Sequence, residues 1–325
     1  CNQLPCRTLG ALTPEKPGQS AGDRIVTKRN LIADVLRLKS EKNALILAHN
    51  YQLPEIHAVA DIVGDSLELA LAARNATEPV LVLCGVRFMA ETAHILNPEK
   101  KVLLPSPDAG CPLADYLTPG MILEAKGKYP DAAVVVYINS TAECKAVSDS
   151  VCTSGNAVRI VKSLKQRRII FGPDTNLASY VQSVLPDKEI IPIPEGCHCY
   201  VHVKFDTEDL KEVKAAGIPI MVHPECPASI RAHADHVTST GKMAEIARTG
   251  SAWYICTEVG MLDRLKELCP GQSFIGLEEA VCADMKKITL QELISCMRNL
   301  SGEVTVPPEV MEGAKRALEY MISVP

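Results

Sequence analysis

The sequence is poor in the features that mark several classes of protein. Aromatic residues make up 4% of its 325 residues, with a single Trp and four Phe. No stretch approaches the roughly 18 consecutive apolar residues of a membrane-spanning helix. No run gathers five or six basic residues, and 34 Lys and Arg stand against 39 Asp and Glu, a formal charge of −5. We therefore expect neither a membrane nor a nucleic acid as a partner.

The N-terminal residues also lack the order of a secretory signal. CNQLPCRTLG does not place basic residues before an apolar segment, so we expect a cytoplasmic protein. Residues 1–24, which contain Cys1 and Cys6, are interpreted as a loose arm or an expression remnant. The remaining chain has the balance of an ordinary globular protein, with 47% hydrophobic and 22% charged residues overall.

Cysteine, by contrast, is abundant. The chain has 13 cysteines, and an odd number without a signal peptide disfavours a secreted disulfide framework. A free cysteine is most often a small buried hydrophobic residue. Position in the chain must therefore identify those that bind a metal.

A repeat of about 86 residues organises the chain. Three apolar, β-branched runs that end in polar residues predict buried parallel strands. They span 43–51, 133–139 and 218–225. His49, Tyr137 and His223 stand at their ends, 88 and 86 residues apart. Ligands of such sheets bind beyond the carboxyl ends of the strands, so these residues indicate a site.

Each repeat continues in the same way. A serine follows each anchor after 17, 17 and 16 residues and is predicted to cap a helix: Ser66, Ser154 and Ser239. A second strand is predicted at 80–85, 168–172 and 252–257. A further helix and strand lead in each repeat to a cysteine: Cys111, Cys199 and Cys282.

Three copies of one unit predict an α/β fold of three pseudo-symmetric small domains, each a parallel sheet flanked by helices, around a central site. The predicted domains span 25–112, 113–200 and 201–305. Residues 306–325 are predicted to form a C-terminal helix that packs on the outside.

The three equivalent cysteines lie 88 and 83 residues apart and would meet on a threefold axis. Three thiolates suit a zinc with one open position or an iron–sulfur cluster with one unligated iron. Cys197 lies two residues before Cys199 and could replace it as a ligand.

Seven motifs in order resemble the quinolinate synthase family over residues 25–305. They are His49-Asn-Tyr51-Gln52, Gly64-Asp65-Ser66-Leu67, Cys84-Gly85-Val86-Arg87, His198-Cys199-Tyr200-Val201-His202, His223-Pro224-Glu225-Cys226, Thr238-Ser239-Thr240-Gly241 and Thr257-Glu258. The resemblance implies a transferase that condenses iminoaspartate with dihydroxyacetone phosphate in NAD biosynthesis, with loss of phosphate and two waters to give quinolinate. It also implies a [4Fe-4S] cluster held by Cys111, Cys199 and Cys282.

Imidazole, phenol and carboxylate groups at the strand ends suit proton transfer. We predict Glu225 and Tyr51 as the proton-shuttling pair, with His49 and His223 as further catalytic residues. The resemblance places them in the substrate pocket, and helix starts offer N–H groups to anions. The predicted substrate-binding residues are His49, Ser66, Tyr137, Asn139, Ser154, His202, His223, Glu225, Ser239 and Thr240.

Other functions are compatible with converging cysteines. An iron–sulfur redox sensor or electron carrier on the same fold is the main alternative, and it predicts a fourth ligand and no polar strand ends. A zinc-dependent aldolase or hydrolase is another. The expected partners are iminoaspartate, dihydroxyacetone phosphate and, in transient contact, the enzyme that supplies iminoaspartate.

Overall fold

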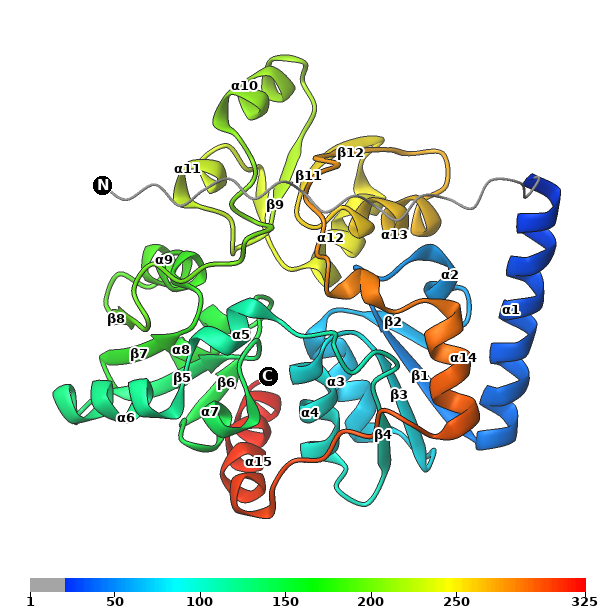
Figure 1. Cartoon of the computed structure of the whole chain (residues 1–325). Helices are drawn as coiled ribbons and strands as arrows, with labels where there is room; N and C mark the ends of the chain where they lie inside the picture. The colour runs from blue at the N-terminus through cyan, green and yellow to red at the C-terminus, as the bar shows by residue number, and fades with distance from the viewer. Residues whose placement is uncertain (1–20) are drawn as a thin grey trace, which may run out of the picture.

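The computed structural model describes residues 21–325, so Cys1, Cys6 and the predicted arm up to residue 20 lie outside the described residues. Three four-stranded sheets form the described chain. In Figure 1 they occupy three lobes, blue to cyan, green, and yellow-green to yellow, around a common centre. The predicted α/β fold of three similar parallel-sheet units is confirmed.

The first sheet has the strand order β2-β1-β3-β4 and is parallel throughout. Its strands are β1 (Ala44–His49), β2 (Ile62–Gly64), β3 (Val80–Cys84) and β4 (Lys101–Leu103). The helices between them are α2 (Pro54–His57), α3 (Ser66–Asn75) and α4 (Arg87–Leu96). Every residue of β3 is buried, as expected for a central parallel strand covered on both faces.

The second sheet repeats this order as β6-β5-β7-β8. Its strands are β5 (Ala133–Tyr137), β6 (Ser150–Cys152), β7 (Arg168–Gly172) and β8 (Glu189–Pro192). The accompanying helices are α5 (Pro112–Tyr116), α6 (Pro119–Lys128), α7 (Ala142–Ala146), α8 (Ala157–Ser163) and α9 (Thr175–Val184).

The third sheet has the order β10-β9-β11-β12. Its strands are β9 (Ile220–Val222), β10 (His236–Val237), β11 (Ala252–Cys256) and β12 (Ser273–Gly276). The helices are α10 (Thr207–Ala215), α11 (Ala228–Arg231), α12 (Thr240–Ile246) and α13 (Gly260–Leu268), with 3-10 turns η1 (Ala247–Thr249) and η2 (Met285–Lys287).

The edge strands β2, β6 and β10 are only two or three residues long and were not predicted from the sequence. An aspartate near the start of each edge strand fixes it to the first strand of the unit. The carboxylates of Asp61, Asp149 and Asp235 accept the backbone N–H groups of Ile46, Val134 and Ile220 at 2.9, 2.7 and 2.8 Å. Their own N–H groups donate to the carbonyl oxygens of the same three residues. A threefold repeat of side-chain contacts thus supports the threefold repeat of strands.

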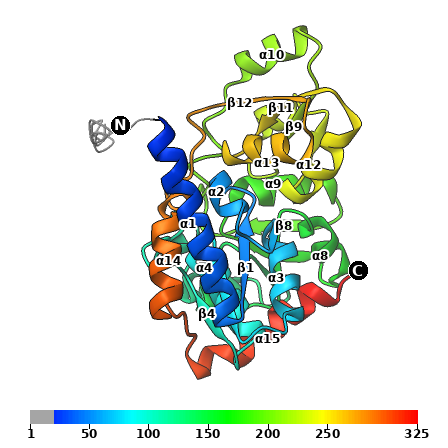
Figure 2. The same ribbon diagram turned by 90° about the vertical axis from the view of Figure 1, so that its right-hand side faces the viewer.

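Two peripheral helices pack on the first unit. α1 (Ala21–Lys42) begins within the predicted arm and runs alongside α14 (Leu290–Asn299) in both views (Figures 1 and 2). After α14 the chain pairs with β4, because Leu104 N–H donates to the Gly302 carbonyl at 2.8 Å. This segment falls in the range predicted for the third domain, yet its contacts are with the first.

The C-terminal helix α15 (Pro308–Ser323) contacts α7 and β6 of the second unit and α4 of the first. Its apolar face, formed by Ala314, Ala317, Leu318 and Met321, is buried. Gly313 lies so close to the Ala146 backbone that a side chain there would clash. The helix therefore bridges two units at their periphery. Within the described residues, no helix combines the length and apolarity needed to cross a membrane.

Candidate active site

One pocket collects residues from all three units. Its free volume is about 770 Å3, the open mouth included. The predicted site residues that line it are His49, Tyr51, Ser66, Cys111, Tyr137, Asn139, Ser154, Cys199, His202, His223, Glu225, Thr240 and Cys282. Ser239 is the one predicted residue that does not line it.

The strand end of the first unit forms a tight turn at His49. The ring nitrogen Nδ1 of His49 accepts the backbone N–H of Tyr51 at 3.2 Å. An acceptor at Nδ1 places the ring proton of a neutral imidazole on Nε2. Burial, helped by the charges of His57 and Lys286, lowers the pKa of His49 to about 3. The turn therefore presents a neutral imidazole to the pocket.

The third unit repeats this turn at His223. Its Nδ1 accepts the backbone N–H of Glu225 at 3.4 Å, and its Nε2 donates to the Ser154 hydroxyl of the second unit at 3.1 Å. Burial, followed by the charge of His202, lowers the pKa of His223 to about 3. The His223 ring stacks on that of His202 with centroids 4.4 Å apart.

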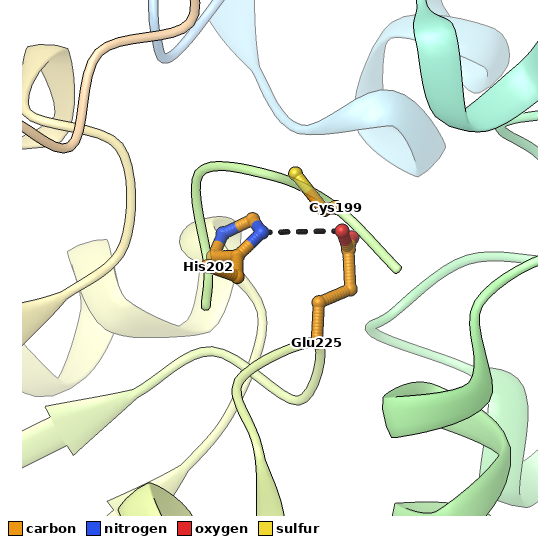
Figure 3. Close-up of side chains that lie close together, drawn as sticks. All are labelled: Cys199, His202 and Glu225. Atoms are coloured by element: carbon orange, nitrogen blue, oxygen red, sulfur yellow. Dashed lines mark ion pairs between the residues drawn. The ribbon is translucent and has the colours of Figure 1, made fainter. Parts of the chain in front are cut away.

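Glu225 is a buried carboxylate with partners at both oxygens. The Tyr137 hydroxyl donates to Oε1, and Nδ1 of His202 lies 3.1 Å from Oε2 (Figure 3). Burial acts to raise the pKa of Glu225, but the charge and contact of His202, with His223 and Tyr137, outweigh it and lower the pKa to about 2. For His202, burial acts downward and is overcome by Cys199 and Glu225, which raise its pKa. Glu225 is therefore ionised and His202 is its cation.

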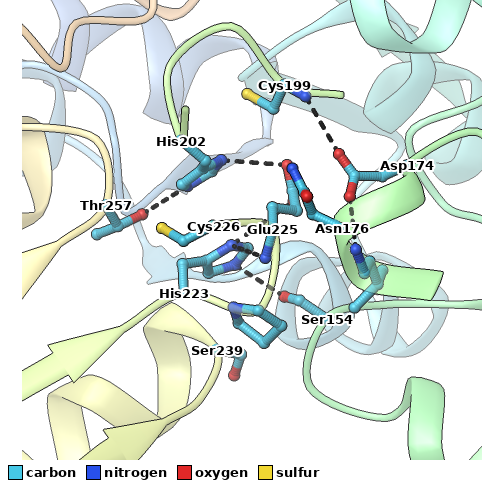
Figure 4. Close-up of polar contacts among 12 residues, drawn as sticks. Ser154, Asp174, Asn176, Cys199, His202, His223, Glu225, Cys226, Ser239 and Thr257 are labelled. Carbon is cyan, nitrogen blue, oxygen red and sulfur yellow. Dashed lines mark hydrogen bonds and ion pairs between the residues drawn. The ribbon is translucent and has the colours of Figure 1, made fainter. Parts of the chain in front are cut away.

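Two hydrogen bonds and one ion pair connect Tyr51 to Glu225. The Tyr51 and Thr257 hydroxyl oxygens are 2.6 Å apart. Nε2 of His202 lies 2.9 Å from the Thr257 oxygen (Figure 4). His202 then meets Glu225 through its other ring nitrogen. Burial raises the pKa of Tyr51, so its phenol stays protonated. The two residues predicted as a proton-shuttling pair are thus linked through Thr257 and His202.

The helix-capping prediction is wrong for Ser66. Asp65 caps α3, accepting the N–H groups of Leu67 and Glu68 at 3.0 Å each, while Glu68 accepts the N–H of Asp65 at 2.7 Å. Ser66 is the first helical residue, which frees its hydroxyl to face the pocket. Asp65, directly before Ser66, takes the N-cap position because a carboxylate oxygen is the stronger acceptor for the first N–H groups of a helix.

The prediction is also wrong for Ser154 and holds for Ser239. The N-terminal cap position of α8 is Asn156, and the Ser154 hydroxyl instead contacts His223. Ser239 caps α12, accepting the N–H of Lys242 at 3.5 Å, and donates its own proton to Asp65 at 3.1 Å. Ser239 thus joins the first and third units beside the pocket rather than within it.

Exposure separates the three predicted ligand cysteines from the rest. Cys111, Cys199 and Cys282 are partly exposed and line the pocket. The eight other cysteines among residues 21–325 are buried: Cys84, Cys144, Cys152, Cys197, Cys226, Cys256, Cys269 and Cys296. Burial raises the pKa of the Cys199 and Cys282 thiols.

A backbone contact distinguishes Cys199 from Cys197. The strands β3, β7 and β11 occupy the same place in the three sheets. After each of them, a backbone N–H donates at 2.8 Å to the carbonyl two residues before the pocket cysteine of that unit. The pairs are Arg87 with Ala109, Thr175 with Cys197 and Val259 with Ala280. Cys197 is therefore the counterpart of two alanines, and Cys199 is the counterpart of Cys111 and Cys282.

Comparison with known proteins decides the family. Residues 33–323 match a family model described as quinolinate synthetase A protein. The chain belongs to the quinolinate synthase family. Its relatives include the quinolinate synthase of Pyrococcus furiosus, 51% identical over 89% of this chain and 96% of the relative. Those of Thermococcus kodakarensis and Thermotoga maritima are 49% and 46% identical over 91% and 90% of this chain and 98% of each relative.

One group of mixed donors also lies in the pocket of this quinolinate synthase family member. The Cys199 sulfur, a ring nitrogen of His202 and a carboxylate oxygen of Glu225 lie within 4.8 Å of one another (Figure 3). Both ring nitrogens of His202 and both oxygens of Glu225 already contact protein groups. A metal held by all three would have to displace those contacts.

Three polar residues of the site were not among those predicted from the sequence. Thr257 and Glu258 were quoted within a family motif without a role, and Asp174 was not singled out. Thr257 links Tyr51 to His202, while Asp174 and Glu258 contact the backbone of two pocket cysteines. Thr257 is the last residue of the strand predicted at 252–257, and Asp174 lies two residues after the strand predicted at 168–172. The polar residues at the end of the second strand of these repeats were therefore the available signal.

Proposed function

We propose that the protein is a transferase that condenses iminoaspartate with dihydroxyacetone phosphate to quinolinate, phosphate and two waters in NAD biosynthesis. One observation carries the proposal. A single pocket gathers three partly exposed cysteines, one from each unit, beside an ionised carboxylate and a protonated phenol. Family membership supplies the reaction, and the pocket supplies acid, base and metal ligands for it.

We propose that Cys111, Cys199 and Cys282 hold a [4Fe-4S] cluster. The donor set fits this cluster, because three thiol side chains line the same pocket and the described residues offer no fourth cysteine there. An iron without a cysteine ligand acts as a Lewis acid that polarises a substrate oxygen or nitrogen and stabilises developing negative charge. An electron-transfer cluster normally has four protein ligands, so this set argues against the redox-carrier alternative.

Ring formation requires one group that takes a proton and one that gives a proton. Glu225 is the base in this scheme, since its carboxylate is ionised at neutral pH and faces the pocket. Tyr51 is the acid, since burial keeps its phenol protonated. The contacts from Tyr51 through Thr257 and His202 to Glu225 provide a route by which the proton returns between turnovers. Positioned acid–base groups of this kind contribute about 10²–10⁴-fold to a rate.

The hydroxyl and amide groups around the pocket bind the anionic substrates in our proposal. Ser66, Ser154 and Thr240 offer hydroxyls near the starts of α3, α8 and α12, and Asn139 offers an amide. We assign Ser66 and Ser154 to the phosphate. Asp65 also lines the pocket, but its charge is satisfied by donors from Leu67, Glu68 and Ser239, and it therefore repels an anion less than a free carboxylate does.

The chemistry also suggests where the protein works. An open-iron cluster is sensitive to oxidation, so we propose a reducing cytoplasm as its compartment. Iminoaspartate is unstable in water, and transient contact with the enzyme that supplies it would shorten its exposure.

The test is quinolinate formation by anaerobically purified protein given both substrates, with iron and sulfide counted on the same sample. Product together with about four irons per chain supports the proposal. A full cluster without product would favour the redox alternative, and zinc in place of iron would favour a zinc enzyme.

The cysteine assignment has its own test within the same assay. Cys199→Ala should abolish iron binding and turnover, whereas Cys197→Ala should retain both, since its thiol is buried outside the pocket lining. The opposite result would contradict the assignment of the second ligand.

A further inference from the structure

Two buried carboxylates stand directly behind pocket cysteines. Asp174 is fully buried, and its Oδ2 accepts the backbone N–H of Cys199 at 3.1 Å (Figure 4). Its other oxygen, Oδ1, accepts the N–H of Leu177 in the first turn of α9 at 2.6 Å. One carboxylate therefore joins the cysteine loop of the second unit to a helix start.

Glu258 does the same in the third unit. It is 1% exposed, its Oε1 accepts the backbone N–H of Cys282 at 3.0 Å, and its Oε2 accepts the N–H of Gly260 at the start of α13 at 2.7 Å. Lys286 lies 3.1 Å from Oε1 and also donates to the backbone carbonyl of Tyr51. This carboxylate thus connects the Cys282 loop with the turn of the first unit.

The two acids occupy equivalent places in the repeat. Each directly precedes the residue, Thr175 or Val259, whose N–H bonds the carbonyl two residues before the cysteine. The counterpart in the first unit is Val86, which offers no acceptor. There a carboxylate arrives from the third unit instead, because Asp284 accepts the N–H of Gly110 at 3.3 Å.

We infer that Asp174 and Glu258 are positioning residues that hold the Cys199 and Cys282 loops in the geometry needed to ligate the cluster. The inference rests on the proposed function, since it assumes that these cysteines are ligands. Both oxygens of each acid accept an N–H, so neither Asn nor Gln can replace it: the amide nitrogen would face a second donor. Partners behind metal ligands typically change metal affinity or activity 10–100-fold when they are replaced.

The experiment compares Asp174→Asn and Glu258→Gln with the full-length protein reconstituted anaerobically with iron and sulfide. We measure the rate of iron loss to a chelator, the electron paramagnetic resonance spectrum of the reduced cluster, and the circular dichroism of each apoprotein. We expect both variants to lose iron about tenfold faster and to show altered spectra, while their apoproteins remain folded.

Asp206→Asn is the matched control. Asp206 also caps a helix, but it is exposed and uses one oxygen, which accepts the N–H of Glu208 at 2.8 Å; asparagine keeps that acceptor. We expect native iron retention and a native spectrum.

Three results would overturn the inference: native rates and spectra in Asp174→Asn and Glu258→Gln, an equal effect in Asp206→Asn, or unfolded apoproteins in both test variants. The last would mean that the acids support whole units rather than two loops. An unsubstituted protein that binds no iron and sulfide would contradict the proposed function itself, and the two failures are thereby distinguished.

Discussion

The strand-end turns of the first and third units share one histidine–backbone hydrogen bond but hold side chains in opposite protonation states. In both, a buried histidine accepts through Nδ1 the N–H of the residue two positions later. That residue is Tyr51 in the first unit and Glu225 in the third. Burial keeps Tyr51 protonated, whereas His202 and Tyr137 keep Glu225 ionised. The same turn therefore presents a protonated phenol on one side of the pocket and an ionised carboxylate on the other.

The two turns share their histidine and differ at the residue two positions later. The histidines are electrostatically alike, since burial lowers the pKa of His49 and of His223 to about 3. The turns differ in the residue two positions after the histidine, Tyr51 or Glu225, and in the side chains that contact this residue. Glu225 has a cation from its own unit and a hydroxyl from the second, while Tyr51 has a hydroxyl from the third. Each turn is completed by its neighbours.

Removing the charge of the third-unit turn should have the largest effect. Glu225→Gln keeps the shape but loses the base, and we expect turnover to fall about 10²–10⁴-fold with the cluster retained. Activity and iron content are measured on one preparation. The control is Glu212→Gln on the exposed face of α10, and a Glu225→Gln enzyme with native turnover would refute the assignment of the base.

Removing the proton of the first-unit turn should have a smaller effect. Tyr51→Phe keeps the ring against His49 and deletes only the hydroxyl that meets Thr257. We expect turnover to fall about 10²-fold, at the lower end of acid–base effects, because solvent can replace the donor in part. The matched control is Tyr116→Phe, which alters an exposed hydroxyl. An equal loss in both variants would show that Tyr51 has no special role.

Cutting the link between the turns should cost less still. Thr257→Val removes the hydroxyl shared by Tyr51 and His202 but leaves both residues in place. We expect turnover to fall about tenfold, equivalent to about 1.4 kcal/mol, near the net value of a hydrogen bond to a charged group. In a double-mutant cycle with Tyr51→Phe the two losses should not add. Additive losses would mean that Thr257 acts independently of Tyr51.

Much of this arrangement could be predicted because it repeats in sequence. His49, Tyr137 and His223 mark strand ends at near-constant spacing, and the structure brings them to one pocket. The resemblance to the family then supplied His202 and Thr240, which belong to no threefold set. Position in the repeat was also enough to distinguish Cys199, as a predicted ligand, from most of the other cysteines.

What could not be predicted depends on contacts between residues far apart in the chain. Thr257 and Tyr51 are 206 residues apart, and nothing local to either indicates that they meet. The edge strand β2 is held by the carboxylate of Asp61, fifteen residues from its partner Ile46, rather than by β propensity. Likewise α14 is amphipathic in sequence, but only the fold shows that its apolar face covers the first unit.

The smallest predicted effect concerns the buried histidine that both turns contain and its contribution to the pH dependence of stability. A histidine whose pKa falls from 6.5 to about 3 on folding binds its proton more readily in the unfolded chain, so acid favours unfolding. Each such histidine should remove about 1 kcal/mol of stability between pH 6.5 and 5.5 and none above neutral pH. His49→Asn removes this titration while its side-chain oxygen can still accept the Tyr51 N–H. Denaturant unfolding of the apoprotein at the two pH values should therefore show about 1 kcal/mol less acid destabilisation in the variant. An identical pH dependence would mean that folding leaves the pKa of His49 near its ordinary value, which would remove the electrostatic likeness between the two turns.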